Sequence, residues 1–150
     1  MANTQAMVTS FMGKLMTGTH NFGTGVVRAS TAADTFKIAL YTSSATLSAS
    51  TTAYTTSGEV ASTGNYSAGG NTLTISQAPT STSTTAWLDF ADTTWSNATI
   101  TANGALIYNS TQSDKAVCVL AFGGDKTSTA GDFTIIFPTA DSSNAIIRIA

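Results

Sequence analysis

The last third of the chain reads, between its turns, GALIYNS (104–110), KAVCVLAF (115–122), DFTIIFP (132–138) and NAIIRIA (144–150). Each run is short, rich in Val, Ile, Phe and Tyr, and bounded by Gly, Asn, Asp or Ser, which is typical of strands joined by turns. Between two of them lies GGDKTSTAGD, whose glycines and aspartates favour chain reversal. We therefore expect 115–122 and 132–137 to form an antiparallel pair.

The same alternation extends toward the N-terminus. It is present in TFKIALYT (35–42), NTLTISQ (71–77) and TTAWLDFADTTW (84–95), and more weakly in ATITANG (98–104). Seven or eight short strands separated by turn residues predict a mainly β protein, with a single antiparallel β-sandwich or jelly-roll-like domain over 34–150.

One N-terminal helix is expected over residues 4–17, followed by a Gly- and Thr-rich connection. Its apolar residues recur at spacings of three and four, Asn3 or Thr4 can cap it, and Gly18 can end it. Such a stripe can pack on its own domain or on a neighbouring subunit. We treat residues 1–22 as an arm whose candidate interface residues are Met7, Phe11, Leu15, Met16 and Phe22.

The composition is poor in charge and rich in hydroxyl groups. Only 9% of residues are charged, nearly a third are Ser or Thr, and the net charge is −2. Six cations are too few for a phosphate backbone, so we expect no nucleic-acid partner. Hydroxyl-rich faces suit strands and interfaces, although a compositional habit of the source would give the same pattern. The stretch 43–70 is expected to be a long excursion, which is usually functional or lies against a partner.

Residues that carry chemistry are sparse. His20, Cys118 and Glu59 are each the single residue of their type, so no Ser-His-Asp, Cys-His or paired-Glu arrangement can be assembled. Asp89 with Asp92, or Asp125 with Asp132, remain formal carboxylate pairs, but neither has the spacing of a calcium loop. We expect no enzyme activity, no metal and no cofactor, and we expect Cys118 to be a small buried apolar group.

Aromatic residues allow a different class of function. Exposed rings on a β-sandwich can stack on sugars, and the candidates for a carbohydrate-binding module are Tyr54, Tyr66, Trp87 and Trp95. The alternative is that these rings fill the core.

The first residues show no basic leader with an apolar core, and no stretch approaches 18 apolar residues. We therefore expect neither a signal peptide nor a membrane span, and synthesis in the cytoplasm.

Several segments together resemble a family of small virion structural proteins of tailed bacteriophages. They are the KIALYT strand, Tyr-Thr-Thr-x-x-Glu-Val at 54–60, Gly-x-Tyr-x-Ala-Gly-Gly at 64–70, the GALIYN strand and the turn at 122–126. The similarity runs from about Asp34 to Ala150.

The resemblance implies a structural role in a particle assembled in the bacterial cytoplasm. The major capsid protein and copies of the chain itself are the expected partners, with no membrane. A capsid decoration or cement protein is the first expectation, and a tail, fibre or head-tail connector component is the alternative.

Overall fold

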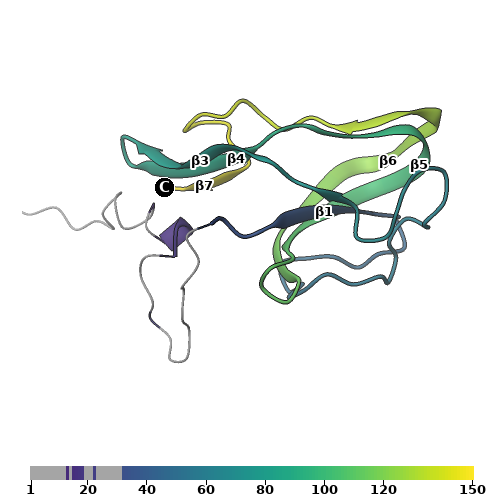
Figure 1. Ribbon diagram of the computed structural model, residues 1–150, viewed down its shortest axis with the longest axis horizontal. Helices are drawn as coiled ribbons and strands as arrows, with labels where there is room; N and C mark the ends of the chain where they lie inside the picture. The colour runs from purple at the N-terminus through teal and green to yellow at the C-terminus, as the bar shows by residue number, and fades with distance from the viewer. Residues whose placement is uncertain (1–12, 14, 19–21, 23–31) are drawn as a thin grey trace, which may run out of the picture. The chain divides into compact units, whose positions relative to one another are not determined.

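The computed structural model describes residues 13, 15–18, 22 and 32–150, which are mainly β, as predicted. Two antiparallel sheets are formed, with strand orders β2-β1-β5-β6 and β3-β4-β7 (Figure 1). The strands are β1 (Phe36–Tyr41), β2 (Asn71–Thr72), β3 (Ile75–Thr82), β4 (Thr85–Phe90), β5 (Thr93–Asn109), β6 (Lys115–Ile135) and β7 (Ile147–Ile149).

The strands divide between two compact units. The large unit contains Ala32–Thr74 and Asp92–Ile135 and holds the four-stranded sheet. The small unit contains Ile75–Ala91 and Ile136–Ala150 and holds the three-stranded sheet. A single sandwich was expected over 34–150, but the strands of this range are divided between the two units. The single sandwich therefore stays a prediction.

The large unit is built on one long antiparallel ribbon, β5 with β6, that bends back on itself (Figure 1). Phe122 and Phe133 both lie on β6, and a straight strand would separate them by about 36 Å. Their ring centroids are only 6.5 Å apart. The two halves of the ribbon therefore face each other, and the rings of Trp95 and Phe133 pack between them at 6.3 Å.

The expected hairpin between 115–122 and 132–137 is wrong, although the two segments do come together. Both belong to β6, and both pair with β5 rather than with each other. The Gly-rich segment between them bends the strand instead of reversing it, because Gly123 and Gly124 take φ values of 71° and 147°. A register shift between Ala102 and Gly104 accommodates the same bend in β5.

The small unit is a β3–β4 hairpin with the short β7 beside β4. β3 continues past the end of the strand expected over 71–77, since Thr80 to Thr82 pair with β4. Pro79 is tolerated there because β3 is an edge strand. The rings of Phe90 and Phe137 pack at 6.0 Å within this unit.

The predicted helix over 4–17 lies mostly outside the described residues, and it stays a prediction. Among the described residues, Gly13, Leu15 and Met16 are helical, and the amide of Thr17 donates to the carbonyl of Gly13. Gly18, expected as the helix end, takes a φ of 72°.

The bend in β6 requires a residue at position 124 that can adopt a positive φ, and this requirement can be tested by mutation. A side chain at φ 147° is strained even though no atom lies within 4 Å of the added Cβ. We predict that Gly124→Ala lowers the free energy of unfolding by about 1–3 kcal/mol, measured by urea denaturation. Gly131→Ala is the matched control on the same strand, because the nearest atom to its Cβ is 3.6 Å away and its φ is not positive. Equal stability of the two variants would contradict the assigned role of Gly124.

Candidate functional site

Glu59 is the centre of a polar network in the large unit. It lies in the excursion after β1, where an antiparallel bridge joins it to Tyr41. One carboxylate oxygen, Oε1, accepts hydrogen bonds from the Tyr66 hydroxyl at 2.7 Å and the Gly69 amide at 2.7 Å. The other, Oε2, accepts from the Tyr54 hydroxyl at 2.6 Å. Hydrogen bonds to a charged acceptor are the strong ones.

The tyrosines carry this network to the sheet. The Tyr66 hydroxyl accepts a hydrogen bond from the Leu40 amide of β1 at 2.9 Å, in a buried position. The Tyr108 hydroxyl of β5 donates to the carbonyl of Gly69 at 2.8 Å. The Tyr41 hydroxyl donates to the carbonyl of Thr55 at 2.6 Å. The excursion is thus fixed to both central strands.

Apolar packing follows the same path. Ala39, Tyr41, Leu106 and Tyr108 form a buried cluster on one face of the sheet, and residues of the excursion pack on it. Tyr54 stacks on Tyr108 with ring centroids 4.8 Å apart. The excursion was expected to be functional or to lie against a partner, but here it covers its own sheet. The excursion is therefore held on the sheet by apolar packing as well as by the hydrogen bonds of Glu59.

The pKa of each of the four tyrosines of the chain is raised. Burial raises the pKa of Tyr41 and of Tyr108 to about 12, and for Tyr108 the nearby Asp114 and Glu59 add to the effect. Burial, reinforced by the hydrogen bond to Glu59, raises the pKa of Tyr54 and of Tyr66 well above the ordinary phenol range. A neutral phenol is what the folded state requires.

The aspartates are placed as structural residues. Asp125 accepts a hydrogen bond from the Asn103 side chain at 2.8 Å, and Asp132 accepts one from the Asn97 amide at 3.3 Å. Asp89 is fully buried in β4, where its Oδ1 accepts from the Phe90 amide at 2.8 Å. Within the described part of the chain, no three His, Cys, Asp or Glu residues lie close enough to hold a metal ion.

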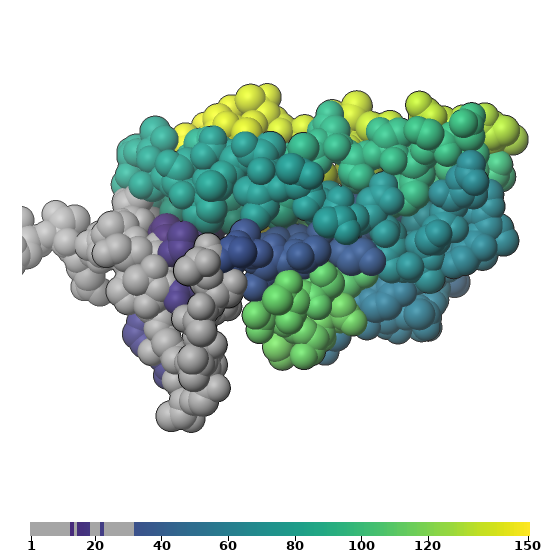
Figure 2. All heavy atoms as spheres, viewed as in Figure 1, coloured from purple at the N-terminus to yellow at the C-terminus, as the bar shows by residue number. Residues whose placement is uncertain are grey.

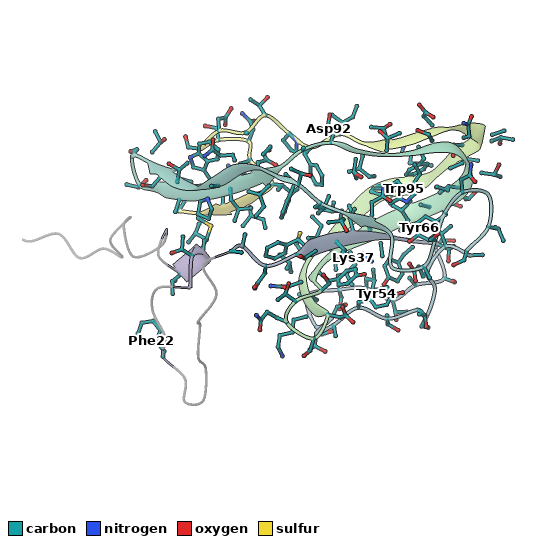
Figure 3. The ribbon with its side chains drawn as sticks, in the orientation of Figure 1. Phe22, Lys37, Tyr54, Tyr66, Asp92 and Trp95 are labelled. Atoms are coloured by element: carbon teal, nitrogen blue, oxygen red, sulfur yellow. The ribbon has the colours of Figure 1, made fainter. Side chains whose placement is uncertain are left out.

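The sugar-binding candidates do not form an open platform. Tyr66, Trp87 and Trp95 are only 2%, 8% and 4% exposed. In the large unit, Tyr66 packs on Trp95 with ring centroids 5.8 Å apart (Figure 3). Tyr54 is half-buried and engaged with Glu59. The rings serve packing in this structure, which weighs against a carbohydrate-binding module.

The interface candidates are only partly covered by the structure. Met7 and Phe11 lie outside the described residues. Leu15 and Phe22 are 37% and 81% exposed, and Met16 is half-buried. These exposures are compatible with a contact surface on the N-terminal arm.

An exposed hydroxyl face runs along the β5–β6 ribbon. Threonines pair across the strands, Thr94 with Thr134 at 2.8 Å and Thr101 with Thr127 at 3.3 Å between their hydroxyl oxygens. All four are exposed. The turn between the strands is exposed as well, over 111–114 (green in Figure 2).

The outer edge of β6 is the second feature of this surface. The strand order places β6 at the end of its sheet. Its first residues are bonded, since the Ala116 amide donates to the Thr52 carbonyl at 3.0 Å and the Asp114 carbonyl accepts from the Tyr54 amide at 2.8 Å. Beyond them, no described strand pairs with the outer side of β6 as far as Ile135.

A depression of about 280 Å³ adjoins this edge. Its walls are apolar or hydroxyl-bearing and come from the excursion, β5 and β6: Ser48, Ala49, Thr51, Leu106, Ala116, Val117, Cys118 and Val119. Cys118 is half-buried, and burial raises the pKa of its thiol, so it stays protonated at neutral pH. We name the outer side of 117–135 together with this depression the β6 edge.

The sequence presented Glu59 as a glutamate without a catalytic partner and as part of the 54–60 segment, and neither observation predicted its hydrogen-bond network. The available signal was its isolation, since a single glutamate between tyrosines in a charge-poor chain indicates a specific partner set. The β6 edge was hidden by the wrong hairpin, which gave residues 115–122 a partner they do not have.

Comparisons with known proteins give no relative. No family model, no curated protein and no solved structure matches the chain. No helix within the described residues has the length and apolar character to cross a membrane.

The tyrosine pKa values predict alkaline lability. Folding favours the protonated phenol, so this stabilisation is complete below pH 10 and is lost as the pH rises from 10 through 12. We expect the tyrosinate absorbance of the native protein to lag behind that of the protein in denaturant and to rise together with loss of circular dichroism. Tyr41→Phe should reduce the pH dependence in this range. Native tyrosines that titrate near pH 10 would contradict the network.

Proposed function

We propose that this chain is a non-enzymatic structural protein of a tailed-phage virion, and that its role is to decorate or cement the capsid. The sequence resemblance supplies the phage context. The observation that supports a structural role is the exposed, charge-poor surface of the β5–β6 ribbon, where hydroxyl groups pair across strands and a sheet edge is open.

Such a surface is suited to association. Burying a hydroxyl that keeps a hydrogen bond costs much less than burying a charge. An open edge offers backbone groups to a neighbouring chain. The carboxylate and the tyrosines, which are the groups that would be suspected of chemistry, are engaged in holding the fold.

In this proposal, the partners are the major capsid protein and copies of the same chain, and the site of action is the virion. The N-terminal arm, with Leu15 and Phe22 exposed, is a further contact surface. The alternative role, as a tail, fibre or connector component, predicts a much lower number of copies per particle. Counting the copies in purified particles therefore separates it from the capsid role.

We predict that particles assembled without this protein keep their shell but lose resistance to heat and osmotic shock, because interfaces that bridge shell subunits are missing. The measurement is the release of packaged DNA on heating, for particles with and without the protein. Adding purified protein should restore the resistance. Unchanged release would contradict the cement role, and a copy number far below that of the shell protein would assign the chain to the tail.

A further inference from the structure

We propose that the 117–123 part of the β6 edge is a self-association site, at which two copies of the chain pair these segments antiparallel about a two-fold axis centred on Leu120. This inference deepens the proposed role, in which the chain associates with copies of itself, by naming the surface and the symmetry. It concerns residues 117–123 of the large unit.

The segment has the character of a strand that is completed by another chain. Natural proteins protect an open edge with charge, proline or a cover. Residues 116–124 contain no charged residue and no proline. Val117 is 39% exposed, and the depression beside it is lined by Val117, Cys118 and Val119. A second strand along this edge would extend the sheet and cover that apolar wall.

The flanking charges specify the register. Asp114 and Lys115 precede the uncharged segment, and Asp125 and Lys126 follow it. All four are exposed. In an antiparallel register centred on Leu120, Lys115 of one copy corresponds to Asp125 of the other and Asp114 to Lys126, so these charges flank the paired backbone of 117–123 at its two ends. The two-fold axis repeats both pairs, so opposite charges meet at both ends of the shared strand.

The backbone contacts and dihedral angles at the two ends of 117–123 limit the pairing of the two copies to that segment. Thr52 and Ala53 already occupy the outer side of Lys115 and Ala116. In the proposed register, Ala116 lies opposite Gly124 of the other copy. Gly123 and Gly124 have positive φ, and β6 turns there. The turn at Gly123 and Gly124 of one copy therefore lies opposite Ala116 of the other copy. That is the position at which the outer side of β6 is already bonded to Thr52.

The test uses charge reversal in the purified full chain. We expect sedimentation to show a monomer–dimer equilibrium for the unaltered protein. Lys115→Asp alone and Asp125→Lys alone should each weaken dimerisation about tenfold, because two attractive pairs become repulsive. An equimolar mixture of the two variants should form a heterodimer about as tight as the original dimer. Asp132→Lys is the matched control, since it makes the same charge change on β6 outside the paired segment.

Hydrogen exchange supplies a readout that does not depend on charge. The amides of 117–123 should exchange more slowly at protein concentrations where the dimer forms, while those of the exposed turn at 111–114 should not. A monomer at all concentrations, reversals no different from Asp132→Lys, or a mixture that fails to pair would overturn the proposal. All of these measurements use the isolated protein, so their failure would leave the particle assays as a separate test of the cement role.

Discussion

The large unit depends on the hydrogen bonds that the carboxylate of Glu59 accepts. A single side chain receives two tyrosine hydroxyls and one backbone amide, all at 2.6–2.7 Å. A carboxylate placed in a partly buried site is tolerated only when donors replace the water it has lost. Here those donors come from the excursion itself. Through Tyr66, the same network reaches the amide of Leu40 in the middle of β1. The Glu59 network is thereby one of the attachments of a segment of nearly thirty residues that has little regular structure of its own.

Close backbone approaches complete this attachment. Gly70 lies against β1, where a Cβ would fall 1.8 Å from the carbonyl oxygen of Ile38. Gly64, with a φ of 57°, lies against Thr99 of β5. The segments 54–60 and 64–70 thus contain the glutamate, two of its tyrosines and the glycines that let the chain pack closely.

Local patterns in the sequence predicted the strands well and their pairing poorly. Alternation located β1 and β4, although residues on both faces of each strand are buried. The Gly-rich segment after Phe122 was interpreted as a hairpin, since glycine at positive φ serves a tight turn and a strand bend equally well. Only the pairing of β6 with β5 on both sides of the bend distinguishes the two. Likewise, the burial of Tyr66 and Trp95 depends on contacts between residues about 30 positions apart, which alternation does not encode.

The charge of Glu59 is central because it holds the excursion on the sheet, and equilibrium unfolding of Glu59→Gln tests this role most directly. The amide keeps the shape but removes the charged acceptor, so we expect a loss of about 2–3 kcal/mol in the free energy of unfolding. The amides of Gly69 and Leu40 should also exchange faster. Asp114→Asn, an isosteric change at an exposed aspartate, should cost far less. A Glu59→Gln variant no less stable than Asp114→Asn, with both amides equally protected, would contradict the central role of the Glu59 charge.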